Sequence, residues 1–193
     1  SESGQPILQS PASPFLRWMV LVGILAAVGG LSFDLLITRP VLFRRGSSVT
    51  ARSLGDQLAS RILRLVWIGM VLFFIGSVAQ LIVQAAVIHD IPLLRTLGSP
   101  VRSLLTDTDW GRLWLWRVGL LMGMVVPMGM IYTIPSKERE KHRAVGFLHS
   151  LIRILALTFG IGVLFNLSQV SHGAATVEIR SAAIVSDYLH LLA

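Results

Sequence analysis

Four long apolar segments, separated by polar linkers, dominate the pattern of hydrophobic and polar positions along the chain. A helix rises 1.5 Å per residue, so about 20 apolar residues cross a hydrocarbon core of about 30 Å. We therefore expect four transmembrane helices, over residues 15–38, 61–88, 113–134 and 146–170. The first should end at Arg39-Pro40, because proline lacks the N–H that continues a helix. A fifth apolar helix begins at about residue 184 and stops too early to cross a membrane.

The composition agrees with a chain that lipid surrounds. Hydrophobic residues make up 53% of the 193 residues, charged residues only 14%, and the mean hydropathy is +0.71. An ordinary soluble domain is about one quarter charged. We predict an all-α polytopic transmembrane helix bundle over residues 15–193, after an extracytoplasmic polar tail or linker over residues 1–14. Because the chain opens on Ser1 and its last apolar helix is cut short, we also expect a fragment of a longer protein.

Lysine and arginine are divided unequally between the two sides of the predicted membrane. The first and third linkers, with the adjoining span ends, hold eleven of them: Arg39, Arg44, Arg45, Arg52, Arg61, Arg64, Lys137, Arg139, Lys141, Arg143 and Arg153. The opposite side holds six: Arg17, Arg95, Arg102, Arg112, Arg117 and Arg180. Cytoplasmic flanks carry the excess of positive charge. We therefore expect these two linkers to face the cytoplasm and the amino terminus to lie outside.

Several classes of chemistry are excluded or lack support. The chain has no cysteine, which removes disulfides, thiolate metal sites and cysteine nucleophiles. The net charge of +7 is spread over short linkers rather than along one basic stripe, so nucleic acid is not the expected partner. No Walker loop, dinucleotide fingerprint, HExxH motif or nucleophile elbow occurs. We therefore predict neither an enzyme nor an organic cofactor.

Asp34 is the one carboxylate that lies well inside a complete span. An ionisable group in the hydrocarbon is costly and is therefore a functional candidate. Asp34 lies about one turn from the predicted cytoplasmic end, where Arg39 or the arginine-rich linker can neutralise it. We favour a structural ion pair over a functional role for this residue.

Methionine is concentrated in the third span, in the stretch MGMVVPMGM. Met124 and Met128 are spaced i, i+4 and share one face of the helix. Two thioether sulfurs on one face suit a soft ion such as Cu(I). Methionine is also a common gap-filler in apolar packing, and we favour that interpretation over a ligand role.

Three histidines, His89, His172 and His190, fall on the predicted outer side. Asp187 and His190 are spaced i, i+3 on the short fifth helix, and His172 follows the fourth span. Imidazole and carboxylate suit Cu(II) or Zn(II), and imidazole with thioether suits Cu(I). From the spacing alone we favour interfacial histidines that bind no metal.

Four short segments carry a family resemblance. SHGAA (Ser171 to Ala175) and SDYLHLLA (Ser186 to Ala193) lie on the predicted outer side, GGLSFDLLITRP (29–40) ends the first span, and GRLWLWRVGLL (111–121) opens the third. Taken in order, they resemble the copper resistance protein D (CopD) family, of which this chain would be the amino-terminal part. Gly173 departs from the alanine that is usual there.

The resemblance implies a multi-pass protein of the bacterial inner membrane that helps to move copper from the periplasm toward the cytoplasm. A periplasmic CopC-like copper carrier is the implied partner. His172, and His190 with Asp187, are the implied metal ligands, while His89, Met124 and Met128 are weaker candidates from the residues alone. Two other functions stay open: a haem-binding electron-transfer subunit, which a Soret band would reveal, and a non-catalytic structural subunit of a membrane complex.

Overall fold

The computed structural model describes residues 12–42, 49–133, 143–169 and 180–192, and these residues are almost entirely helical. The elements are α2 (Ala12–Phe33), η1 (Asp34–Thr38), α3 (Arg39–Leu42), α4 (Val49–His89), η2 (Leu93–Arg95), α5 (Ser99–Asp107), α6 (Asp109–Thr133), α8 (Arg143–Ser168) and α9 (Arg180–Leu192). Four segments are long and apolar enough to cross a membrane: Pro14–Thr38, Ser53–His89, Asp109–Ile131 and Gly146–Ser168. The all-α, four-span bundle predicted from the sequence is confirmed.

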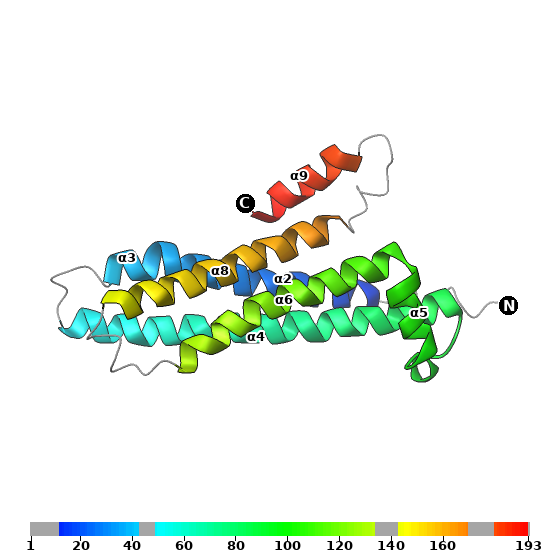
Figure 1. Ribbon diagram of the computed structural model, residues 1–193, viewed down its shortest axis with the longest axis horizontal. Coiled ribbons are helices and arrows are strands. Elements are labelled where there is room, and N and C mark those ends of the chain that lie inside the picture. Colours follow the sequence, from blue (N-terminus) through cyan, green and yellow to red (C-terminus); the bar gives the residue numbers. More distant parts are fainter. Residues whose placement is uncertain (1–11, 43–48, 134–142, 170–179, 193) are drawn as a thin grey trace.

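The four spans lie lengthwise beside one another, and each runs opposite to the one before it (Figure 1). We call the end where α4 stops the His89 end, and the end where η1 stops the Thr38 end. In Figure 1 the His89 end is on the right, next to α5, and the Thr38 end is on the left. Helix α9 lies along α8 and runs from the His89 end toward the middle of the bundle.

Two helix boundaries differ from the prediction. Helix α4 begins at Val49 and has 41 residues, which gives a length of about 60 Å at 1.5 Å per residue. That is about twice the thickness of a hydrocarbon core, so its first turns extend beyond the membrane at the Thr38 end. Helix α9 begins at Arg180 rather than near residue 184. In both cases polar residues join an apolar helix and hide its true start.

The first candidate span ends at Thr38, as predicted, but the helix itself does not stop at Arg39-Pro40. The helix passes through a π-helical turn, η1, and continues as α3 to Leu42. Within this turn the backbone N–H of Arg39 donates to the carbonyl of Asp34, five residues earlier. A wider turn of this kind accommodates Pro40, which cannot donate to the carbonyl four residues before it and would clash with it in a regular helix.

The bundle is built from two close helix pairs, α2 with α4 and α6 with α8. The first pair approaches at glycine: a Cβ on Gly23 would lie 2.6 Å from the backbone nitrogen of Phe73, and one on Gly69 would lie 2.6 Å from the carbonyl oxygen of Gly23. Small residues let membrane helices come this close. A continuous core then joins the two pairs, with α2 packed against α8.

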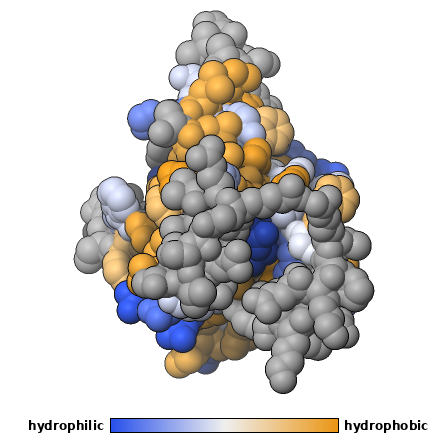
Figure 2. All heavy atoms as spheres, turned by 90° about the vertical axis from the view of Figure 1, so that its left-hand side faces the viewer, coloured by the Kyte–Doolittle hydropathy of each residue, from blue (hydrophilic) through white to orange (hydrophobic). Residues whose placement is uncertain are grey.

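A smaller core at the His89 end attaches α5 and α6 to α4. It contains Leu81, Ala85, Leu104 and Trp114, and the indole nitrogen of Trp114 donates to the carbonyl of Ser77 at 3.0 Å. The outer sides of the spans carry many exposed large apolar side chains, as lipid contact requires. Figure 2 looks at the Thr38 end and shows hydrophilic patches next to these hydrophobic sides.

Candidate functional site

Three charged side chains meet near the Thr38 end: Asp34 in η1, Arg39 in α3 and Arg153 in α8. Oδ2 of Asp34 lies 3.0 Å from Nε of Arg153 and 3.3 Å from Nε of Arg39. The side chains of Asp34 and Arg153 are 1% and 3% exposed, whereas that of Arg39 is 28% exposed. The ion pair predicted between Asp34 and Arg39 is confirmed, and Arg153 is a second cationic partner of the same carboxylate.

The π-helical turn makes this cluster possible. In a regular α-helix, residues five apart point about 140° away from each other. The i to i+5 geometry of η1 instead brings Arg39 back over Asp34. Thr38 supports the turn, because its hydroxyl donates to the carbonyl of Phe33 at 3.5 Å. Single π-helical turns inside α-helices are frequent at functional sites.

Helix α8 completes the cluster from the other side of the interface. Nη1 of Arg39 donates to the hydroxyl of Ser150 at 3.3 Å, which joins segments 111 residues apart. Nη1 of Arg153 donates to the carbonyl of His149 at 3.4 Å, and the His149 side chain is buried. Guanidinium groups cannot ligate a cation. The arrangement therefore fastens η1 and α3 to α8, with one carboxylate between two positive charges.

A second buried polar pair lies toward the His89 end, between α6 and α8. Nε of Arg117 donates to Oδ1 of Asn166 at 3.0 Å, and Nδ2 of Asn166 donates to the carbonyl of Leu113 at 3.0 Å. Arg117 is 3% exposed and Asn166 is 4% exposed. Both polar ends of the Asn166 amide are therefore used, and its orientation is fixed.

Met124 and Met128 lie in the core between these two polar sites. Both are 0% exposed, whereas Met122 is 44% and Met130 is 53% exposed. The sulfur of Met124 approaches α8, because a Cβ on Gly160 would lie 3.5 Å from it. The predicted shared face of Met124 and Met128 is thus the interior face of α6.

The outer histidine site predicted from the sequence is described only in part. His172 and the side chain of Asp187 lie outside the described residues. His190 is exposed on α9, and His89 is exposed at the end of α4, with Nε2 3.2 Å from the hydroxyl of Ser103. Within the described residues no group of three or more His, Asp or Glu side chains is arranged to hold a metal. The site therefore stays a prediction.

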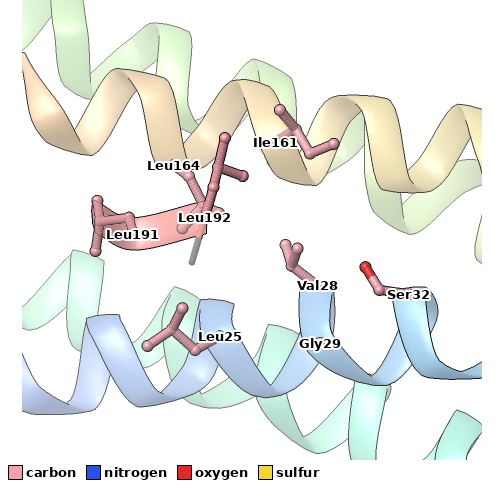
Figure 3. Close-up of a pocket in the computed structure, with 8 residues that line it drawn as sticks. All are labelled: Leu25, Val28, Gly29, Ser32, Ile161, Leu164, Leu191 and Leu192. Carbon is pink, nitrogen blue, oxygen red and sulfur yellow. The ribbon is translucent and has the colours of Figure 1, made fainter. Parts of the chain in front are cut away.

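A groove lies where α9 meets the first and fourth spans. The groove has a volume of about 290 Å³, and its lining comes from α2, α8 and α9: Leu25, Val28, Gly29, Ser32, Ile161, Leu164, Leu191 and Leu192 (Figure 3). The edge-on contact between Phe165 and Tyr188, with ring centroids 5.4 Å apart, holds α9 on α8. Leu191 and Leu192 line the groove with residues of α2 and α8, so the last turn of α9 lies beside these two spans.

Comparison with known families decides the classification. The family described as copper resistance protein D-like, N-terminal domain, matches residues 8–180. The chain belongs to this family. The match includes three of the four CopD-like segments, and the fourth, Ser186 to Ala193, lies beyond it. No curated protein and no solved structure matches the chain. The chain is therefore a multi-pass membrane protein of the copper resistance type.

Three buried polar residues of this CopD-like domain were missed as site candidates: Arg153, Arg117 and Asn166. The two arginines were counted only as topology signals. Arg153 lies seven residues inside the span that begins at Gly146, and Arg117 lies eight residues inside the span that begins at Asp109. At 1.5 Å per residue these positions are about 10 Å from the span ends. That depth was the available signal, because an arginine there needs a partner inside the protein.

Proposed function

We propose that this CopD-like chain is part of a copper permease of the bacterial inner membrane, which takes copper from the periplasmic side toward the cytoplasm. Family membership and the four candidate spans support the proposal. The observation that carries it is the position of Met124 and Met128, fully buried on the face of α6 that contacts the other spans.

A pair of thioethers is chemically suited to binding and releasing Cu(I) during transport. The chain has no cysteine, so methionine is its only source of soft sulfur ligands. A thioether binds Cu(I) without carrying charge. A translocation site must bind the ion well enough to admit it and weakly enough to release it. Two neutral sulfurs in the bundle interior meet both requirements better than a closed thiolate cage.

Copper capture is assigned to the outer side in this proposal. His172, His190 and Asp187 are the proposed ligands, with His89 as a weaker candidate, and a periplasmic CopC-like carrier is the proposed donor. The test is metal analysis of purified protein carrying His172→Ala with His190→Ala. His142→Ala, on the predicted cytoplasmic side, is the matched control. Loss of bound copper in the double variant alone supports the site, and unchanged stoichiometry rejects it.

The proposed orientation puts the His89 end in the periplasm and the Thr38 end in the cytoplasm. The excess of Lys and Arg beside the Thr38 end supports it. Because the chain is free of cysteine, single cysteines report topology directly. An impermeant maleimide added to intact cells should label Ser99→Cys and should reach Gln57→Cys only after the membrane is opened. The reverse labelling would invert the proposed direction of transport.

The decisive test of function is copper accumulation in cells that express the full protein. Met124→Leu with Met128→Leu removes both sulfurs at nearly constant volume, so the fold is retained. Met122→Leu with Met130→Leu makes the same chemical change on exposed positions and serves as the control. We expect accumulation to fall severalfold for the buried pair and to stay at the wild-type level for the exposed pair. Equal accumulation in the two double variants would reject the proposed path.

A further inference from the structure

The Arg117–Asn166 pair is unusual because its positive charge lacks a described counter-charge. Arg117 lies inside a candidate membrane span and is 3% exposed. Its one described partner is the neutral oxygen of Asn166, 3.0 Å from Nε. In the part of the chain that the structure describes, no carboxylate forms an ion pair with Arg117. Leaving a guanidinium uncompensated in hydrocarbon is costly.

The other deeply buried arginine, Arg153, has a carboxylate partner that neutralises its charge. Arg153 is as buried as Arg117, but the carboxylate of Asp34 lies 3.0 Å from its Nε. At the corresponding place beside Arg117 the chain has an amide instead of a carboxylate. The charge of Arg153 is therefore neutralised by a carboxylate, whereas Arg117 has a neutral amide as its described partner.

The side chain at position 166 is an amide rather than a carboxylate for a specific reason. Its Nδ2 donates to the carbonyl of Leu113 at 3.0 Å. A carboxylate in this position would face that carbonyl with two acceptors and no donor. Asn166 therefore fixes Arg117 without neutralising it, and the remaining guanidinium N–H groups of Arg117 stay available to an acceptor from outside the described residues.

We propose that Arg117 and Asn166 form a binding site for a small free anion, a halide or a simple carboxylate, at the His89 end of the bundle. The planar guanidinium fork matches either kind of acceptor. The bound anion supplies the counter-charge that the described residues lack.

The site acts on copper through charge, and this step rests on the proposed function. Arg117 and Met124 are seven residues apart on the interior face of α6, a rise of about 10 Å. At that separation and an effective dielectric constant of about 20, an unneutralised Arg117 weakens binding of Cu(I) roughly tenfold. An anion on Arg117 cancels this repulsion. Copper and the anion therefore bind with positive cooperativity, which is reciprocal.

The first experiment contains no copper, so it can fail independently of the proposed function. Thermal unfolding of the purified full chain is followed while chloride or acetate replaces isethionate at constant ionic strength. Binding to the folded state should raise the midpoint progressively with anion concentration. Asn166→Asp supplies a fixed carboxylate to Arg117, and Arg117→Met removes the charge; both should abolish the anion dependence. Arg112→Met, at an exposed position on the same helix, should retain it.

Two results would overturn the anion site, and a third would assign the counter-charge to the chain itself. One is a midpoint that responds to neither chloride nor acetate in the unmodified chain. The other is an Asn166→Asp variant that keeps the wild-type response. If Glu178→Gln or Asp187→Asn creates an anion response that the unmodified chain lacks, the counter-charge comes from the chain itself and the proposal of a free anion is wrong.

The second experiment measures the coupling to copper. Cu(I) affinity is determined by competition with a chromogenic chelator in isethionate buffer, which contains neither halide nor carboxylate. Asn166→Asp should bind Cu(I) about tenfold more tightly than the unmodified chain, because its carboxylate neutralises the charge of Arg117 permanently, as a bound anion would. Equal affinities would overturn the coupling. A tighter affinity that persists in Met124→Leu with Met128→Leu would place the copper elsewhere.

Discussion

Replacing Arg153 by methionine tests the charge cluster at the Thr38 end. The change leaves the carboxylate of Asp34, 1% exposed, with Arg39 as its one described cationic partner. Removing one member of a buried ion pair costs about 3–5 kcal/mol, and because Arg39 remains we expect the lower end, about 3 kcal/mol. For a chain of this size, 1 kcal/mol shifts the midpoint by about 2–4 °C, so the midpoint should fall by roughly 6–12 °C.

The assay is thermal unfolding in detergent, followed by tryptophan fluorescence. Arg39→Met should lower the midpoint much less, because that side chain is 28% exposed and its partner keeps Arg153. Asp34→Leu combined with Arg153→Met removes both buried charges. It should cost less than the sum of the two single changes, because neither partner is left uncompensated.

The exposed pair Arg112–Asp109 provides the control, with side chains 68% and 91% exposed. Asp109→Asn should leave the midpoint unchanged within about one degree, since exposed ion pairs contribute little. The reasoning is refuted if Arg153→Met is no more harmful than Asp109→Asn. It is also refuted if the effects of Asp34→Leu and Arg153→Met simply add.

Two further changes test the packing that positions the sites. Gly69→Ala puts a Cβ 2.6 Å from the carbonyl of Gly23 and should cost about 1–3 kcal/mol, whereas Gly29→Ala meets no atom within 4 Å and should be neutral or slightly stabilising in the same unfolding assay. Trp114→Phe removes the 3.0 Å hydrogen bond to Ser77 and should cost about 1 kcal/mol, with faster hydrogen exchange in α5. Equal midpoints for Gly69→Ala and Gly29→Ala, or unchanged exchange in Trp114→Phe, would contradict these expectations.

The long spans were predictable because lipid imposes a length and a composition on any helix that crosses it. The ion pair of Asp34 with Arg39 was predictable for a similar reason, since a carboxylate inside a span needs a nearby cation. That Met124 and Met128 share one face of the helix followed from their i, i+4 spacing. These features depend on local sequence and on the solvent.

The remaining features depend on which helices pack together. Nothing local pairs Asp34 with Arg153 or Arg117 with Asn166, because each contact joins different spans. The π-helical turn at Asp34 was missed because Pro40 signals a helix end in most contexts. The packing of α9 along α8 was not predictable for the same reason, since the contact of Phe165 with Tyr188 joins two separate helices.

The most direct test of the central claim is X-ray absorption at the copper edge on protein loaded with Cu(I). The chain has six methionines and no cysteine, so every sulfur ligand must be a methionine. We expect sulfur scattering in the unmodified chain and in Met122→Leu with Met130→Leu, and its loss in Met124→Leu with Met128→Leu. Sulfur scattering that survives in the Met124→Leu with Met128→Leu variant, or bound copper without any sulfur neighbour in the unmodified chain, would contradict a thioether path through the bundle.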